Sequence, residues 1–226
     1  MTDATEILTP KGLLLDFGGV IWATLFERHA FSEARLGLTP GSLDWRGPFD
    51  PAGDRLWADM IAGEISERDY WARRAAQVGR LIGEDWDMLT LVRRTASDDP
   101  NAFVRSEALA TVRRAKAAGL RVGVLSNELE LFHGREDMEA LEILRTMDSI
   151  VDATHTRILK PDPRAYALGC EALGVAPQNV VFVDDQMRNV EGARRAGLDA
   201  VWFDITRPGA SFAEAERRLG LAAVSG

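Results

Sequence analysis

The sequence has only one cysteine, Cys170, so the chain has no pair of thiols for an internal disulfide and no thiolate cluster for zinc. It also lacks an apolar run approaching the roughly 20 residues that a membrane-spanning helix needs. The opening residues MTDATEILTP do not have the basic and then apolar layout of a secretory signal. Together these absences predict a soluble, cytoplasmic protein with no membrane partner.

Basic charge is also scarce, because 27 Lys and Arg residues face 35 Asp and Glu residues and give a formal net charge of −8. An extended nucleic-acid surface needs a basic face, so this balance argues against a nucleic-acid partner. A pocket that is positive only locally can still bind a small phosphorylated molecule. The composition does not indicate an oligomeric state. A length of 226 residues with 46% hydrophobic residues predicts one large domain or a domain with an insertion.

Apolar strand-like runs alternate with helical patterns through much of the chain. We expect strands in residues 12–17, 120–127, 149–154, 179–185 and 198–204, and helices at 104–119, 161–174 and 187–197, with a further helix ending near residue 147. Such alternation is typical of a parallel sheet with helices on both faces. The predicted fold class is therefore α/β, with a Rossmann-like core.

Residues 22–97 interrupt this alternation. Residues 23–97 contain four of the six tryptophans and many charged residues, but no convincing strand. Ser66 is a plausible N-cap for a helix that begins in ISERDYWARR, and Gly63 is placed to end the helix before it. We expect a helical cap domain at 22–97, inserted into a core formed by residues 1–21 and 98–226.

Polar residues follow the predicted strands where each strand ends or where the next helix begins. They are Asp16, Ser126, Asn127, Lys160, Asp184 and Asp185. Each alone has a simpler explanation: Lys160 as a solvated lysine before a proline, and the others as turn or helix-capping residues. In open α/β sheets, however, ligands bind outside the carboxyl ends of the strands, so we expect these residues to converge on one site.

The residue types suit phosphoryl transfer. A carboxylate can attack phosphorus and form an aspartyl-phosphate, and Mg²⁺ prefers oxygen ligands such as carboxylates. Hydroxyl, amide and ammonium groups can hold phosphoryl oxygens while charge is neutralised. We therefore expect Asp16 to be the nucleophile, Asp16 and Asp185 to bind Mg²⁺, and Ser126, Asn127 and Lys160 to bind phosphate.

The ordered motifs DFGGV, VLSN, KPDP, VFVDD and NVEGARRAGL resemble the haloacid dehalogenase-like (HAD) hydrolase superfamily, most closely its phosphatase branch with a helical cap after the first motif. The resemblance covers residues 12–205. It implies a nucleophilic and metal-binding Asp16, a catalytic and phosphate-binding Lys160, and a metal site completed by Asp185 and the Gly18 carbonyl.

Two details of this implied metal site are less regular. Two adjacent acids do not point easily into one site, so Asp185 is the expected ligand, with Asp184 beside it or in contact with the metal. Asn189 occupies a position where many members of the superfamily have another acid, which implies a weaker outer role.

The sequence departs from the resembled phosphatases at Gly18. Most of them have an aspartate there that protonates the leaving group, and such help is typically worth ~10²–10⁴-fold in rate. The glycine leaves three possibilities: a substrate whose leaving group needs little protonation, such as a sugar 1-phosphate, a substitute acid, or weak catalysis.

Three functions follow from these observations. The first is a Mg²⁺-dependent phosphatase that acts on a small phosphorylated metabolite. The second is a metal-independent 2-haloacid dehalogenase, which the acid pair Asp184–Asp185 argues against. The third is a binding or regulatory protein that kept the phosphate pocket but lost efficient catalysis.

Overall fold

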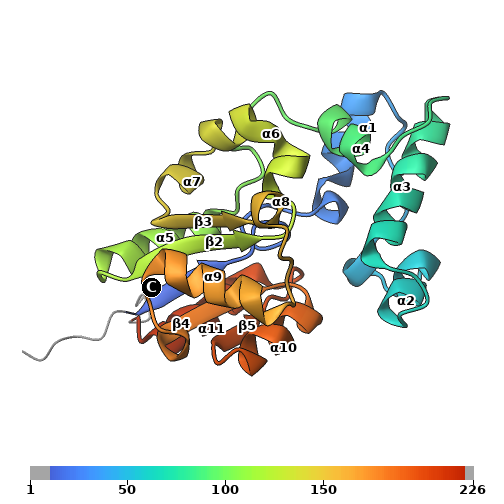
Figure 1. Cartoon of the computed structure of the whole chain (residues 1–226). Helices are drawn as coiled ribbons and strands as arrows, with labels where there is room; N and C mark the ends of the chain where they lie inside the picture. Colours follow the sequence, from blue (N-terminus) through green and yellow to red (C-terminus); the bar gives the residue numbers. More distant parts are fainter. Residues whose placement is uncertain (1–10, 222–226) are drawn as a thin grey trace, which may run out of the picture. The chain divides into compact units, whose positions relative to one another are not determined.

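The computed structural model describes residues 11–221, so the expectation about the opening stretch MTDATEILTP lies outside the described part. The described chain divides into two compact units. Unit 1 contains residues 11–22, 104–128 and 143–221, and unit 2 contains Ala23–Phe103 and Leu129–Glu142. Each unit is formed by separate stretches of the chain, which can be followed by the sequence colours in Figure 1.

Unit 1 is built on a five-stranded parallel sheet in the order β3-β2-β1-β4-β5. The strands are β1 (Gly12–Leu15), β2 (Arg121–Ser126), β3 (Ser149–Asp152), β4 (Val180–Asp184) and β5 (Asp199–Trp202). The central strand β1 consists of Gly12 and three leucines. All three leucines are fully buried, as expected for a strand covered on both faces. The α/β fold class and all five predicted strands are confirmed.

Helices cover both faces of this sheet (Figure 1). On one face, α5 (Ser106–Ala117) and α11 (Pro208–Leu219) contact each other and the strands. On the other face, α9 (Pro163–Leu173) and α10 (Met187–Arg195) do the same. Short helices α7 (Glu142–Arg145), α8 (Ala153–Thr156) and the 3-10 turn η3 (Pro177–Asn179) complete the connections.

The helix α9 illustrates how local sequence fixes an element next to the site. Asp162 caps its first turn by accepting a hydrogen bond from the Arg164 N–H, and Pro163 occupies the first helical position. Gly174 ends the helix in the left-handed conformation, with φ of 70°. Between these ends, Tyr166, Cys170 and neighbouring apolar residues pack against the sheet. The single cysteine is therefore part of the core.

The regular elements of unit 2 are all helices, joined by irregular loops. Its elements are η1 (Leu25–Arg28), α1 (His29–Leu36), η2 (Gly47–Phe49), α2 (Arg55–Ile61), α3 (Glu67–Leu81), α4 (Met88–Arg94) and α6 (Leu129–Ala140). The predicted N-cap Ser66 accepts a hydrogen bond from the Asp69 N–H at the start of α3. The division places residues 98–103 and Leu129–Glu142 in unit 2, whereas the sequence analysis assigned both to the core. The packing of α6 against α4 accounts for the second difference.

The interior of unit 2 combines aromatic rings with a buried ion pair. The ring of Phe26 lies 5.2 Å from that of Trp71 and 5.5 Å from those of Trp45 and Trp57 (centroid distances). Asp54 is almost fully buried and pairs with Arg74. Its carboxylate also accepts hydrogen bonds from the Tyr70 hydroxyl at 2.8 Å and from the Gly47 N–H at 3.0 Å. These partners satisfy a carboxylate that would otherwise be costly to bury.

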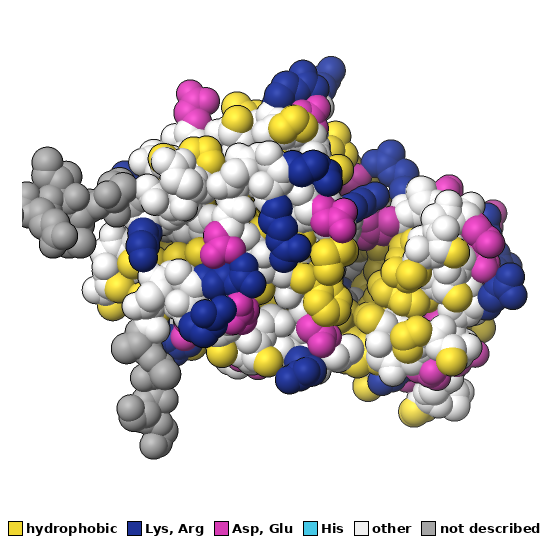
Figure 2. All heavy atoms as spheres, turned by 90° about the horizontal axis from the view of Figure 1, so that it is seen from below, with side chains coloured by type: hydrophobic (Ala, Val, Ile, Leu, Met, Phe, Trp, Pro, Cys, Tyr) yellow, Lys and Arg dark blue, Asp and Glu magenta, His cyan; other side chains and the backbone are white. Residues whose placement is uncertain are grey.

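The charged surface carries both signs. On the face shown in Figure 2, basic side chains lie next to acidic ones rather than forming one continuous basic surface. Surface ion pairs such as Arg218 with Glu214, at 2.7 Å, follow this pattern. No helix within residues 11–221 is both long enough and apolar enough to cross a membrane.

Candidate active site

Asp16 directly follows the central strand β1, at the carboxyl end of the sheet. Its N–H donates to the Val183 carbonyl at 2.9 Å, which extends the pairing of β1 with β4 by one residue. The chain then turns sharply, because the N–H groups of Ile21 and Trp22 both donate to the Phe17 carbonyl at 2.9 Å. This turn leaves the Asp16 side chain at the carboxyl end of the central strand, where it is buried.

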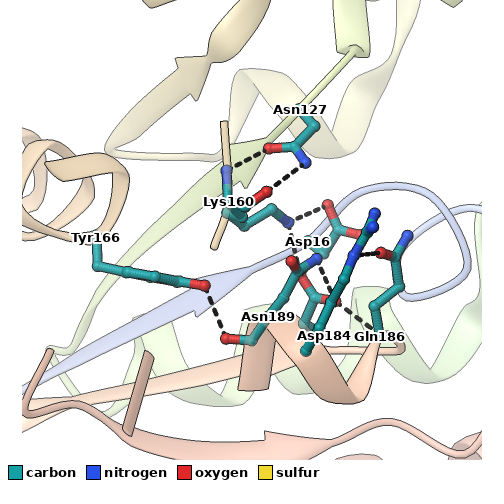
Figure 3. A network of polar contacts seen from close by, with 8 residues as sticks. Asp16, Asn127, Lys160, Tyr166, Asp184, Gln186 and Asn189 are labelled. Carbon is teal, nitrogen blue, oxygen red and sulfur yellow. Dashed lines mark hydrogen bonds and ion pairs between the residues drawn. The ribbon is translucent and has the colours of Figure 1, made fainter. Parts of the chain in front are cut away.

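Lys160 joins Asp16 to a second acid, Asp184 (Figure 3). Its Nζ atom lies 2.8 Å from Oδ1 of Asp16 and 2.6 Å from Oδ2 of Asp184. Burial alone would lower the pKa of Lys160, but attraction by the two carboxylates and the hydrogen bonds to them raise it above its usual value. Lys160 is therefore a permanent cation between two acids.

The pKa of Asp16 is raised to about 7. Burial is the largest cause, the charge of Lys160 opposes it, and the negative charge of Asp184 adds to it. An additional cation near Asp16 would favour its ionised form, because opposite charge stabilises a carboxylate. The side chain thus lies in an environment where its ionisation depends on nearby charges.

Asp184 is held by several donors. Besides Lys160, it accepts hydrogen bonds from the Gln186 N–H at 2.8 Å and from Nδ2 of Asn189 at 3.0 and 3.1 Å. The hydroxyl of Tyr166 in turn donates to the Asn189 carbonyl at 2.7 Å, as Figure 3 shows. Asn189, for which we expected a weak outer role, therefore orients the buried acid directly.

Asp16, Asp184 and Asp185 bring carboxylate oxygens within 4.8 Å of one another. Within residues 11–221, this is the only such group of three or more metal-binding side chains. We expected that two adjacent acids would not easily point into one site, but Asp184 and Asp185 both bring a carboxylate oxygen into this group. Asp184 ends strand β4, whereas Asp185 lies beyond it in a turn, so the alternation of strand side chains no longer separates them.

Asp185 lies against the glycine turn that follows Asp16. A Cβ atom on Gly19 would approach Oδ2 of Asp185 to 2.3 Å, so a larger residue there would force this carboxylate to shift. Gly19 also has φ of 79°, a conformation that favours glycine. The backbone of Asp185 is fixed as well, since its carbonyl accepts a hydrogen bond from the Trp202 Nε1–H at 2.8 Å.

Asn127 contacts the backbone of Lys160. Its Nδ2 donates to the Lys160 carbonyl at 3.1 Å, and its Oδ1 accepts from the Lys160 N–H at 2.8 Å. In this structure the amide therefore fixes the lysine loop, and the phosphate-binding roles of Asn127 and Ser126 stay predictions. Ser126 ends β2 beside Asp152 of β3, and it is buried at the same edge of the sheet.

Gly18 is exposed, and a Cβ atom there would meet nothing within 4 Å. The backbone thus leaves room for a side chain that the sequence does not supply. The predicted role of the Gly18 carbonyl as a metal ligand stays a prediction. Sequence reasoning missed Tyr166, which holds Asn189, and Arg105, whose guanidinium donates to the Gly19 carbonyl. Neither belongs to a strand end and neither carries a spacing signal.

Comparison with known proteins places the chain among hydrolases. The model of the family described as haloacid dehalogenase-like hydrolase matches residues 10–197. The chain is 33% identical over 209 residues to a phosphoserine phosphatase of Thermus thermophilus, a match that covers 83% of this chain and 81% of that protein.

Other relatives match over shorter stretches. The chain is 35% identical over 100 residues to (S)-2-haloacid dehalogenase 4A of Burkholderia cepacia, covering 42% of this chain and 41% of that protein. Matches of this kind span less than half the length of the relatives concerned.

The fold comparison agrees with these relatives. The structure of the HAD-hydrolase YfnB of Bacillus subtilis, whose description calls it putative and bound to magnesium, superposes with a TM-score of 0.67 at 14% identity, covering 93% of this chain and 99% of that one. At this identity the likeness concerns the fold alone. From the family match and the full-length phosphatase relative, we conclude that the chain belongs to the haloacid dehalogenase-like hydrolase family.

Proposed function

We propose that the protein is a Mg²⁺-dependent phosphatase that hydrolyses a small phosphorylated metabolite through an aspartyl-phosphate on Asp16. The observation that carries the proposal is the convergence of three carboxylates around one buried ammonium group. The helical unit 2 is proposed to be the cap that selects the substrate. Similarity to a phosphoserine phosphatase over most of the chain supports the phosphatase activity.

The donor set fits Mg²⁺. Asp16, Asp184 and Asp185 are all hard oxygen donors, the type that this ion prefers. Lys160 neutralises part of their charge and leaves an excess of two negative charges when all three acids are ionised, which a divalent cation balances. Mg²⁺ bound here would neutralise charge on the phosphoryl oxygens and favour the anionic form of Asp16.

The proposed reaction has two steps. First, a carboxylate oxygen of Asp16 attacks phosphorus, the bond from phosphorus to the ester oxygen breaks, and the leaving oxygen takes a proton from water to become the alcohol. Then water attacks the acyl-phosphate, releases inorganic phosphate and restores the Asp16 carboxylate. Lys160, positively charged beside Asp16, is placed to stabilise the phosphoryl oxygens during both steps.

The open position at Gly18 bears on the substrate. No side chain of that residue can donate the proton that the leaving alcohol needs. Esters that leave readily, such as a sugar phosphorylated at its anomeric oxygen or an aryl phosphate, depend least on such a proton. We therefore propose a sugar phosphate of this kind as the preferred substrate class.

Phosphate release from a panel of esters tests the proposal. The panel contains a sugar 1-phosphate, a sugar 6-phosphate, phosphoserine and an aryl phosphate, each with Mg²⁺ and with EDTA. We expect multiple turnovers that require Mg²⁺ and that disappear in Asp16→Asn. A folded protein that releases no phosphate from any ester with Mg²⁺ would contradict the proposal.

A dehalogenase is the second candidate, because relatives named (S)-2-haloacid dehalogenase match part or most of the chain. In that reaction a carboxylate oxygen of Asp16 would displace halide from carbon, and no metal would be needed. The acid pair Asp184–Asp185 speaks for the phosphatase instead. Chloride release from a 2-chloroacid in the presence of EDTA would favour the dehalogenase.

A further inference from the structure

Arg105 joins the start of α5 to the glycine turn beside the site. The residue directly precedes α5 and is almost buried. Its Nε and Nη2 atoms donate to the Gly19 carbonyl at 3.2 and 3.0 Å, so one oxygen receives two hydrogen bonds from a charged fork. Its own N–H donates to the Ile21 carbonyl at 2.9 Å. Both its side chain and its backbone are thus bonded to the turn.

The guanidinium group of Arg105 is itself fixed from the side of β5. Its central carbon lies 5.6 Å from the ring centroid of Phe203, a fully buried residue directly after β5. The N–H of Phe203 donates to the Asp184 carbonyl at 2.9 Å. The residue whose ring contacts the guanidinium is therefore hydrogen-bonded through its backbone to Asp184, the buried acid of the site.

The turn that Arg105 binds carries several features of the site at once. Gly19 follows the open position Gly18, and its α-carbon lies against the carboxylate of Asp185. Its N–H donates to the Trp22 carbonyl at 2.9 Å, which closes the turn that begins after Asp16. A displacement of Gly19 would therefore shift the nucleophile's loop and remove the surface on which Asp185 rests.

We infer that Arg105 is a positioning residue of this site, and that it fixes the Gly18–Gly19 turn in the geometry that metal binding and nucleophilic attack require. The inference rests on the proposed function for its catalytic meaning. Lysine cannot replace the fork, because an ammonium group lacks two parallel planar donors. Residues that orient metal-binding groups typically change metal affinity or activity about 10–100-fold when they are removed.

Two substitutions of Arg105 and a matched control test the inference. Arg105→Met removes the fork, and Arg105→Lys keeps the charge without the two parallel donors. The control is Arg114→Met in the same helix α5, because Arg114 pairs with Glu216 on α11 and does not bind the turn. The first measurement is hydrogen exchange of the peptide that covers residues 17–22, whose amides at Gly19, Ile21 and Trp22 are bonded within the turn.

We expect exchange of this peptide to be at least about tenfold faster in Arg105→Met, intermediate in Arg105→Lys and unchanged in Arg114→Met. Calorimetric titration with Mg²⁺ should show about 10–100-fold weaker binding in Arg105→Met. With the best ester of the panel, kcat should fall and the Mg²⁺ concentration for half-maximal rate should rise, while both stay unchanged in Arg114→Met.

Unchanged exchange of residues 17–22 in Arg105→Met would overturn the inference, whatever happens to activity. An equal effect of Arg105→Met and Arg114→Met on all readouts would reduce Arg105 to a stabilising residue and also overturn it. Failure of the proposed function looks different. In that case the wild-type protein releases no phosphate, while the exchange comparison still decides whether Arg105 anchors the turn.

Discussion

The Nζ atom of Lys160 lies 2.6 Å from Oδ2 of Asp184, and both side chains are buried. An ion pair so removed from water is expensive to form, and it is more expensive to break on one side only. Because Lys160 also contacts Asp16 at 2.8 Å, one cation compensates two acids. The lysine therefore has a structural function as well as its proposed catalytic one.

Replacing Lys160 by methionine should destabilise the protein most at high pH. Without the cation, the ionised carboxylates beside it become more costly to bury, and this cost is relieved at low pH, where carboxylates take up protons. We expect a loss of about 3–5 kcal/mol at pH 8 without Mg²⁺, a typical cost for one side of a buried pair. The loss should be smaller at pH 5.5.

Urea unfolding at the two pH values measures this difference. Lys116→Met is the control, because Lys116 forms a partly exposed pair with Asp148 and should cost no more than about 1 kcal/mol at either pH. A loss in Lys160→Met that does not change with pH would contradict the electrostatic explanation.

Replacing Asp16 by asparagine should abolish turnover and stabilise the fold. Because the pKa of Asp16 is raised in the folded protein, its contribution to stability is greatest at low pH and is lost as pH rises through about 7. Asp16→Asn should therefore melt at a higher temperature than the wild type at pH 8 without Mg²⁺, by about 2–4 °C for each kcal/mol relieved. The advantage should disappear near pH 4.

Thermal melts at pH 4, 6 and 8, beside a phosphate-release assay, check both parts. Equal melting temperatures at pH 8 would show that Asp16 carries no cost of burial. Retained turnover would remove Asp16 from the role of nucleophile.

An aspartate at position 18 should fit the fold and change the substrate preference. Gly18 is exposed, has open space at the Cβ position and does not have positive φ. The cost in stability should thus stay within about 0.5 kcal/mol. If the added carboxyl group protonates the leaving group, kcat/KM should rise for alkyl phosphates, by at most ~10²–10⁴-fold, and much less for aryl phosphates.

Gly18→Asn is the matched control, since it has the same shape and cannot donate the acidic proton. The two variants should differ only with alkyl phosphates. An equal gain for alkyl and aryl esters in Gly18→Asp would show that leaving-group protonation does not limit the wild-type protein.

The fold was predictable from sequence because its core strands have a simple signature. Runs such as LLL before Asp16 and VVFV before Asp184 are continuously apolar, and only a strand covered on both faces buries all of their side chains. Helix α11 was not predicted, and the assignment of α6 to unit 2 was not either. Helix α11 has local signals, with Pro208 at its start and Gly220 at its end, whereas the place of α6 depends on its long-range packing against α4.

The sequence predicts which strand ends supply the residues of the site. It does not predict which of these side chains contact one another. Whether Asp184 or Asp185 meets Lys160 depends on the direction of the backbone after β4, and the amide of Asn127 could reach phosphate or backbone equally well from its position in the sequence. Arg105 lies before an ordinary helix, so only the folded turn reveals what its guanidinium binds.

The last prediction concerns His29 in unit 2, whose ring packs edge-on against Trp45 with centroids 4.2 Å apart. Burial, together with the positive charges of Arg46 and Arg74, lowers the pKa of His29 to about 4, against the opposing charge of Glu33. A group with a lowered pKa of this kind takes up its proton more readily in the unfolded chain. The contribution of the neutral His29 to stability is therefore fully present above about pH 6.5 and is lost as pH falls towards 4.

We expect this loss to amount to about 3 kcal/mol, at 1.36 kcal/mol for each pH unit between the two pKa values. His29→Phe keeps a ring against Trp45 and removes the titration, so its stability should fall less between pH 7.5 and 5. Denaturant unfolding followed by tryptophan fluorescence suits the test, because four of the six tryptophans belong to unit 2. His155→Gln, at an exposed position, should follow the wild type. Parallel pH profiles for wild type and His29→Phe would show that His29 does not titrate between the two states.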